Sequence, residues 1–289
     1  MRVSFATRPG SAEKPTEDFL AAAPSVALVL DGLTSPPELG TGCVHGTPWF
    51  VAQLGTHLLH SATTRPATPL TDLVANAIEA VAGLHSESCD LMHPGTPSCS
   101  VALLREGSQS VDYLSIFDSV IILDGANGAN GANGIEGPDD IPMVVTDLRV
   151  DSYAQEEHKA TQQYAIGTEE HWQAVKRLVA AQRPHRNQPD GYWVAAATPQ
   201  AAYEAVTGSV PRSAVARAAV LSDGASCLVD RYATAHWRSL INLLDTHGPA
   251  EVIAQVRHAE AEDPLGTRWP RYKRSDDSTV VYCVLDELT

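Results

Sequence analysis

The sequence has little positive charge and few aromatic side chains. Its 289 residues include 20 Lys and Arg against 35 Asp and Glu, a formal net charge of −15, and aromatic residues make up 6%. An excess of carboxylates repels phosphate backbones and anionic membrane surfaces, and no basic patch offsets it. We therefore expect no binding to nucleic acid or to a membrane. The expected partners are cations or ligands bridged by cations.

Long hydrophobic runs and closely spaced cysteine pairs are also missing. The longest apolar stretch, residues 19–30, is interrupted by Pro24 and Ser25 and is too short to span a bilayer. Residues 1–10 lack the apolar run of a secretory signal, so we expect a cytoplasmic protein. The five cysteines are scattered without a Cys-x-x-Cys pair, which favours reduced thiols over a disulfide framework.

Hydrophobic residues make up 44% of the chain, enough for a substantial core. Short runs rich in Val, Ile, Leu and Tyr predict strands, and segments with helical spacing lie between them. The predicted strands are 25–30, 99–104, 111–117 continuing to 123, 141–145, 218–221 and 279–285. The predicted helices are 49–59, 69–84, 171–181, 199–206, 231–244 and 250–261. Consecutive strands without an intervening helix predict antiparallel pairing, so the expected fold class is α+β.

Two segments depart from this pattern. Residues 125–134 repeat an Ala-Asn-Gly unit, which favours tight turns and predicts a flexible surface loop. Residues 151–217 are rich in Gln, Glu, His, Arg and Pro and carry few strand signals. This stretch fits either a flap or lid, or a helical insertion that covers a sheet edge.

Aspartates follow or interrupt several apolar runs. Asp31 follows Val-Ala-Leu-Val-Leu, and Asp223 follows Ala-Ala-Val-Leu-Ser. Asp118 lies inside an apolar run, where an unpaired ionised carboxylate is costly, and Asp276 precedes the last strand. Asp-Gly is also a common turn dipeptide, yet the residues after Asp31 and Asp223 do not look like a hairpin return. Several such positions favour one convergent site, and oxygen ligands without clustered histidines favour Mg²⁺ or Mn²⁺.

Five short motifs in a fixed order carry a resemblance to a known family. They are Thr-Glu-Asp-Phe (16–19), Leu-Val-Leu-Asp-Gly (28–32), Ser-Ile-Phe-Asp-Ser (115–119), Leu-Ser-Asp-Gly (221–224) and Asp-Asp-Ser-Thr-Val-Val (276–281). From about residue 5 to residue 285, the chain resembles the metal-dependent protein phosphatases of type 2C, the PPM serine/threonine phosphatases, in a bacterial-type form. This resemblance implies a single domain, a four-layer α-β-β-α sandwich with two central antiparallel sheets.

The resemblance also implies a centre of two Mg²⁺ or Mn²⁺ ions, with a possible third. Its ligands and catalytic residues would be Asp31, which bridges the ions, together with Asp223 and Asp276. The carbonyl of Gly32 would complete the set, Asp118 would serve the third ion, and Glu17 and Asp18 would hold metal-bound waters. A water acidified by the ions would attack phosphorus in line, without a covalent enzyme intermediate.

The chain departs from the family pattern where substrate phosphate binds. Glu13 occupies the place of the usual phosphate-clamping arginine, and Arg8 or Lys14 are candidates to replace it. Leu33 occupies the place of a histidine general acid used by some relatives. Asp277 replaces a usual asparagine, and its extra charge would tune metal affinity.

The resemblance implies hydrolysis of phosphoserine or phosphothreonine on proteins. Two alternatives stay open: a phosphatase that acts on a small phosphorylated metabolite, and a catalytically weak pseudophosphatase that binds a partner as a scaffold. The sequence leaves the oligomeric state and the physiological substrate open.

A second group of candidate ligands is of a different type. Its members are His85, Cys89, His93 and Cys99. The first three have the spacing of one helix face and could bind zinc, although such residues also occur without function at a helix end. Cys43-Val44-His45 is compatible with a thiol nucleophile, but no activating partner is evident and a buried structural cysteine is the simpler interpretation.

Overall fold

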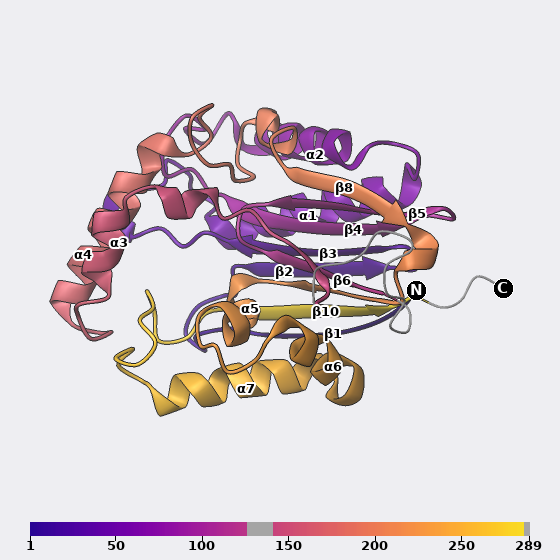
Figure 1. The fold of residues 1–289 in the computed structure, drawn as a ribbon. Coiled ribbons are helices and arrows are strands. Elements are labelled where there is room, and N and C mark those ends of the chain that lie inside the picture. Colours follow the sequence, from indigo (N-terminus) through magenta and orange to yellow (C-terminus); the bar gives the residue numbers. More distant parts are fainter. Residues whose placement is uncertain (126–140, 286–289) are drawn as a thin grey trace.

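Two five-stranded antiparallel sheets form the centre of the molecule (Figure 1). The computed structural model describes residues 1–125 and 141–285. One sheet has the order β1(Arg2–Arg8), β10(Ser278–Val284), β9(Arg217–Leu221), β6(Val120–Asp124) and β7(Met143–Val145). The other has the order β2(Asp18–Ala23), β3(Val26–Gly32), β4(Cys99–Glu106), β5(Ser110–Ile116) and β8(Val206–Pro211). The predicted loop at 125–134 falls, apart from Gly125, outside the described residues.

Helices cover the outer faces of both sheets (Figure 1). One sheet is covered by α1(Thr47–Thr64) and α2(Leu70–His85). The other is covered by α5(Asp223–Asp230), α6(Trp237–His247) and α7(Pro249–Glu262). The helices α3(Gln155–Thr161) and α4(Glu169–Gln182) lie at one end of the sandwich, and the N-terminus lies at the other (Figure 1). The predicted α+β class and the four-layer arrangement are confirmed.

Successive side chains of the central strands point alternately toward the covering helices and toward the core between the sheets. In β3, Leu28 and Leu30 pack against the helices, whereas Ala27 and Val29 pack between the sheets. The same alternation places Val281 of β10 in the core between the sheets. Both faces of these strands are buried, which explains why their sequences read as continuous apolar runs.

The structure differs from several of the predicted elements, and the predicted helix 231–244 begins only at Trp237. The apolar run 111–123 is not one strand: β5 and β6 belong to different sheets, and the chain turns between them at Phe117, whose φ is 68°. Residues 199–206 form only a short 3-10 helix, Pro199–Ala202, before β8. The edge strand β1 and the alanine-rich β2 were not predicted.

The stretch 151–217 contains α3 and α4 at the end of the sandwich and also β8, which pairs with the edge of one sheet through β5. A flap function for it stays a prediction. No helix among the described residues is long and apolar enough to cross a membrane.

Candidate metal centre

Two neighbouring strand ends bring the first acidic pair together. Asp18 begins β2 and lies opposite Asp31 of β3 in the antiparallel register. The N–H of Gly32 donates to the carbonyl of Glu17 at 3.0 Å, which continues the pairing past Asp18. A Cβ at Gly32 would lie 2.5 Å from Cγ2 of Thr47, so only glycine lets α1 begin this close to the strand end.

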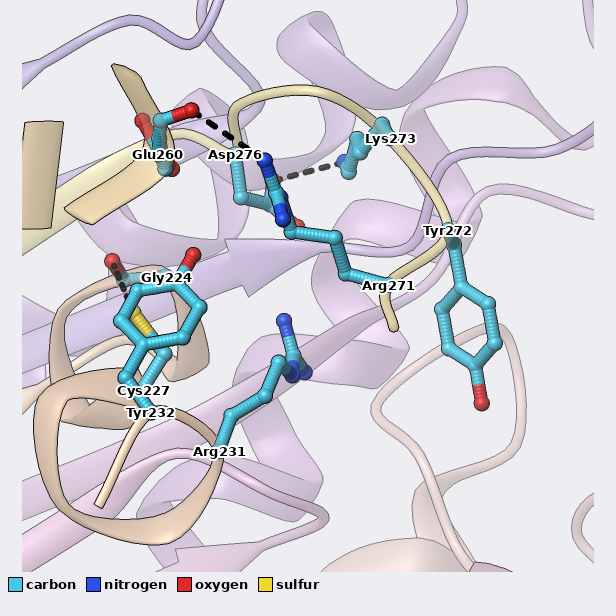
Figure 2. Close-up of a pocket in the computed structure, with 9 residues that line it drawn as sticks. All are labelled: Gly224, Cys227, Arg231, Tyr232, Glu260, Arg271, Tyr272, Lys273 and Asp276. Atoms are coloured by element: carbon cyan, nitrogen blue, oxygen red, sulfur yellow. Dashed lines mark hydrogen bonds and ion pairs between the residues drawn. The ribbon is translucent and has the colours of Figure 1, made fainter. Parts of the chain in front are cut away.

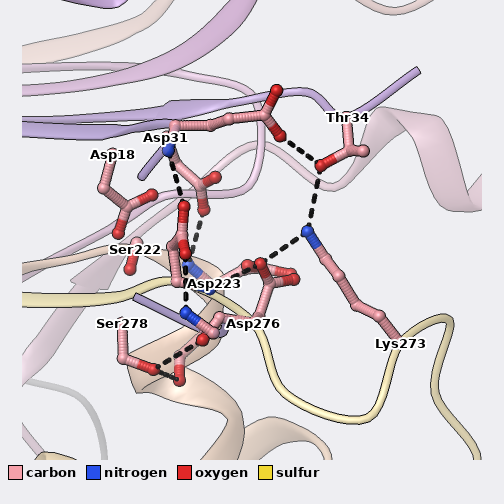
Figure 3. A network of polar contacts seen from close by, with 12 residues as sticks. Asp18, Asp31, Thr34, Ser222, Asp223, Lys273, Asp276 and Ser278 are labelled. Atoms are coloured by element: carbon pink, nitrogen blue, oxygen red, sulfur yellow. Dashed lines mark hydrogen bonds and ion pairs between the residues drawn. The ribbon is translucent and has the colours of Figure 1, made fainter. Parts of the chain in front are cut away.

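Asp223 joins this pair from the other sheet. It follows β9 and is the first residue of α5, and its N–H donates to Oδ2 of Asp31 at 3.3 Å (Figure 3). Gly224 permits a close chain crossing, since a Cβ there would lie 2.0 Å from the carbonyl oxygen of Asp277. The hydroxyl of Ser278 donates to the carbonyl of Gly224 at 2.7 Å. These contacts hold the segment before β10 beside the start of α5.

Asp118 approaches from the turn that links β5 to β6. The positive φ of Phe117 redirects the chain there, and the Phe117 carbonyl accepts a hydrogen bond from the N–H of Asp147 at 2.9 Å. Burial raises the pKa of Asp118 well above its usual range, and the charge of Asp223 raises it further. The two carboxylates therefore interact electrostatically.

The clustered carboxylates raise one another's pKa values. Burial raises the pKa of Asp31 well above its usual range. Further increases come from its acidic neighbours, which are Asp18, Asp223, Asp276 and Asp118. Repulsion of this kind makes the ionised cluster unfavourable unless cations lie within it. The structure thus brings together predicted residues from five separate segments, while their metal-binding role stays a prediction.

Asp18 gives the clearest sign that this cluster fits a cation. Its side chain is 7% exposed, and neither carboxylate oxygen has a hydrogen-bond partner among the described residues. Burial raises the pKa of Asp18 to about 7, and the nearby hydroxyls of Thr279 and Ser222 oppose this rise without reaching hydrogen-bond geometry. A buried carboxylate without partners is costly. Because the donors here are oxygens, they fit a hard cation such as Mg²⁺ or Mn²⁺.

Two basic side chains that the sequence analysis missed border the carboxylates. Nζ of Lys273 lies 2.6 Å from Oδ1 of Asp276 and donates to the hydroxyl of Thr34 at 3.1 Å. Nη2 of Arg231 lies 3.4 Å from Oδ2 of Asp223. Both basic side chains line a pocket beside Asp276 (Figure 2). Burial opposes their positive charges, but the carboxylates outweigh it and raise the pKa of both groups.

Asp277 anchors the loop that precedes β2. Its Oδ1 accepts from the N–H of Gly10 at 2.7 Å. Its Oδ2 accepts from the N–H of Glu17 at 2.6 Å and from the hydroxyl of Thr16 at 3.0 Å. The Glu17 side chain accepts a hydrogen bond from the hydroxyl of Thr34. Asp277 therefore positions the backbone of Glu17, whereas the predicted role of Glu17 in holding metal-bound water stays a prediction.

The two predicted phosphate-binding residues have exposed side chains. Arg8 ends β1 opposite Ser278, and Lys14 lies in the loop before β2. Within residues 1–125 and 141–285, neither side chain forms an ion pair with a carboxylate of the cluster, unlike Lys273 and Arg231. Phosphate binding by Arg8 or Lys14 stays a prediction without support from these contacts.

No protein-family model and no curated protein matches the sequence, but solved structures match along its whole length. The serine/threonine phosphatase PstP/Ppp of Mycobacterium tuberculosis has a TM-score of 0.56 at 16% identity, covering 99% of each chain. The catalytic domain of PstP in complex with 2 manganese ions has a TM-score of 0.54 at 17% identity, covering 99% of this chain and 98% of that one. The PPM phosphatase MsPP of Mycobacterium smegmatis, in complex with cacodylate, has a TM-score of 0.54 at 15% identity, covering 99% of each chain. The chain therefore has the fold of these phosphatases.

Proposed function

We propose that this protein is a Mg²⁺- or Mn²⁺-dependent phosphatase that hydrolyses phosphoserine and phosphothreonine on proteins. One observation carries the proposal: aspartates from both sheets converge, and Asp18 among them is buried with both oxygens unpartnered. The similar structures are named as serine/threonine phosphatases, and one is a complex with manganese, which supports the reaction and the type of metal.

The proposed ligands are Asp31, Asp223 and Asp276 with the carbonyl of Gly32, and Asp118 for a third ion. When bound, divalent cations would acidify a water and offset negative charge on the phosphoryl oxygens. Asp18 would face the cations or their waters from β2. The fixed positions of these side chains come from two packed sheets, so the site is largely organised before substrate arrives.

Lys273 and Arg231 are the proposed phosphate-binding residues. Each is held by a carboxylate of the cluster, and Thr34 fixes the ammonium of Lys273 from the other side. The positive charges of these two side chains, fixed in this way, would attract a phosphate dianion and stabilise the charge on its oxygens as the P–O bond breaks. The guanidinium offers two parallel donors, whereas the ammonium acts as a point charge.

Hydrolysis of p-nitrophenyl phosphate and of phosphoserine peptides tests this function. We expect turnover with Mn²⁺ that EDTA abolishes and that Asp31→Asn and Asp223→Asn lose. Asp190→Asn is a matched control because Asp190 is an exposed aspartate with no place in the cluster. Calorimetric titration with Mn²⁺ provides a readout that is independent of turnover.

Three outcomes would overturn parts of the proposal. Mn²⁺ binding without turnover on any substrate would favour a scaffold over an enzyme. A strong preference for phosphorylated metabolites over phosphopeptides would reject the substrate assignment. Absence of Mn²⁺ and Mg²⁺ binding in the titration would reject the metal centre itself.

A further inference from the structure

A second group of metal-ligand side chains converges away from the aspartates. It consists of Cys43, His45, His85 and Cys89, whose ligand atoms all lie within 4.8 Å of one another. Cys43 and His45 come from the loop before α1, and His85 and Cys89 come from the end of α2 and the turn after it. We refer to these four residues as the Cys/His cluster.

The distances within the Cys/His cluster resemble those around a tetrahedral zinc ion. The two sulfurs are 3.3 Å apart, and Sγ of Cys43 is 3.8 Å from Nδ1 of His45 and 3.6 Å from Nδ1 of His85. Sγ of Cys89 is 3.4 Å from Nδ1 of His45. Zinc–sulfur and zinc–nitrogen bonds of ordinary length would place two sulfurs about 3.8 Å apart and a sulfur about 3.6 Å from a nitrogen. Small movements of the side chains would therefore admit the ion.

Backbone contacts hold the two segments in register. The N–H of Asp90 donates to the carbonyl of Gly42 at 2.8 Å, which joins the turn after α2 to the loop before α1. Gly42 has a φ of 68°, and a Cβ there would lie 2.9 Å from the carbonyl oxygen of Asp90, so this crossing favours glycine. The N–H of Cys89 donates to the carbonyl of His85 at 3.0 Å. The loop crossing thus brings the two ligand pairs together.

Further contacts orient the individual ligands. The N–H of His45 donates to Sγ of Cys43 at 3.4 Å. The indole of Trp49 stacks on the imidazole of His45 with ring centroids 4.4 Å apart and also contacts the buried ring of His85. The indole therefore restricts the orientations that the two imidazole rings can take.

The structure corrects the zinc set expected from adjacent sequence positions. Nδ1 of His93 accepts a hydrogen bond from the N–H of Gly95 at 3.0 Å. Cys99 is fully buried in β4 and pairs through its backbone with Ala195. The observed neighbours of His85 and Cys89 are Cys43 and His45, from a segment about forty residues earlier in the sequence.

We propose that Cys43, His45, His85 and Cys89 bind one Zn²⁺ ion in a closed, structural site separate from the carboxylate centre. Thiolate and imidazole donors select zinc over the hard cations that suit the aspartates. On binding, any protons on the two thiols pass to solvent and no electrons are transferred. Four protein ligands leave no open position for substrate. The ion would instead crosslink the loop before α1 to the end of α2.

A disulfide between Cys43 and Cys89 is the competing explanation for the close sulfurs. The described cysteines are free, and a disulfide would not require two imidazole nitrogens to converge on the same point. The two explanations make opposite predictions, since a disulfide removes both thiolate ligands.

Metal analysis of the full-length chain tests the site. We expect about one zinc per chain by mass spectrometry after purification without added metal and dialysis against EDTA. Replacement of zinc by Co²⁺ should give thiolate-to-cobalt charge-transfer bands and the intense visible bands of tetrahedral Co²⁺. Cys89→Ser and His85→Gln should lose most of the zinc. Cys283→Ala, at a buried cysteine of the core between the sheets, and His93→Gln, at a histidine that lies beside Gly42 but outside the cluster, should retain it.

The wild-type spectrum keeps the proposal falsifiable even if a ligand variant fails to fold. Folded wild-type protein without zinc, and without thiolate bands on addition of Co²⁺, would overturn it. A Cys43–Cys89 disulfide in zinc-free protein would also overturn it, as would retention of zinc in folded Cys89→Ser protein. Bands in wild type and in His93→Gln but not in His85→Gln would support this ligand set.

Discussion

Two groups of metal-ligand side chains lie near the two ends of the segment 31–45, and they differ in chemistry and in the elements that position them. At its start, Asp31 belongs to a cluster of carboxylates that two sheets force together despite their repulsion. At its end, Cys43 and His45 meet His85 and Cys89 through one loop crossing. The comparison indicates that the packed sheets position the proposed reactive site, whereas a single loop crossing positions the proposed structural zinc site.

Removing one carboxylate should affect only one of the two proposed metal sites, and its effect should be the largest. We expect Asp31→Asn to lower Mn²⁺-dependent hydrolysis by at least about a hundredfold, because it removes the side chain that joins both sheets' contributions. Steady-state kinetics with p-nitrophenyl phosphate measures the loss, and zinc analysis of the same sample should show no change. Near wild-type turnover by this variant would contradict the assignment of Asp31 as a ligand.

The pH dependence of stability should reveal the cost of ionising the buried carboxylates. In the folded protein the pKa of Asp18 rises to about 7 and that of Asp276 to about 6, from a usual value of 3.8. Burial is the main cause of both shifts. Between these values and the usual value the folded state binds more protons than the unfolded state, so the stability of metal-free protein falls as pH rises from about 4 to about 7.

The expected fall is on the order of a few kcal/mol. Denaturant unfolding in metal-free buffer at pH 5 and at pH 7.5 measures it, and Mn²⁺ should reduce the fall because the cation stabilises the ionised carboxylates. Metal-free protein that is equally stable at both pH values would show that ionising the buried carboxylates carries no such cost in solution.

Loss of the zinc ligands should affect stability rather than chemistry. We expect Cys89→Ser to lower the melting temperature by roughly 4–8 °C, since a ligand loss of about 2 kcal/mol has this effect in a domain of this size. The kcat of the folded variant should stay within about twofold of wild type. Cys283→Ala is the control, because it costs core packing but should still respond to zinc removal. If zinc removal lowered the melting temperature of Cys89→Ser and of wild type equally, the proposed structural zinc site would be contradicted.

The sequence predicted the α+β class from consecutive strands without an intervening helix, and it predicted the convergence of carboxylates from aspartates that follow apolar strands. Asp31 and Asp223 follow continuous apolar runs, and buried strands of this fold require such runs on both faces. The same signal failed for 111–123, where apolar residues continue across a turn between two sheets. It also missed β1, an edge strand that is mostly exposed.

Long-range partners were the part that sequence could not supply. Lys273 and Arg231 are ordinary basic residues until the fold places them against Asp276 and Asp223. The zinc hypothesis grouped residues that are close in sequence, whereas the observed cluster joins two short pairs across a loop crossing. Local spacing identified one of those pairs, His85 and Cys89.

Two lysines compete as the phosphate-binding residue: Lys273, proposed from its contacts in the structure, and Lys14, proposed from the sequence. We expect Lys273→Met to raise KM about tenfold with a smaller change in kcat, because a single charged hydrogen bond to phosphate contributes about 1.5–3 kcal/mol in a site partly open to water. Lys14→Met serves as the matched control and should leave KM unchanged. The reverse result, with KM raised only by Lys14→Met, would restore the sequence-based assignment.

The smallest effect on stability and metal affinity is expected for replacement of Asp277. This variant tests whether Asp277 anchors the loop before β2 or binds metal like its neighbour Asp276. Both carboxylate oxygens of Asp277 accept backbone hydrogen bonds, one from Gly10 and one from Glu17. Asparagine has a single acceptor oxygen, so Asp277→Asn must lose one of these bonds, at a cost of about 1 kcal/mol. Thermal unfolding should detect a decrease of roughly 2–4 °C, and calorimetry should detect a change of less than about threefold in Mn²⁺ affinity. A larger loss of Mn²⁺ affinity than of stability would assign Asp277 to the metal centre, whereas the reverse keeps it as the anchor of the loop before β2.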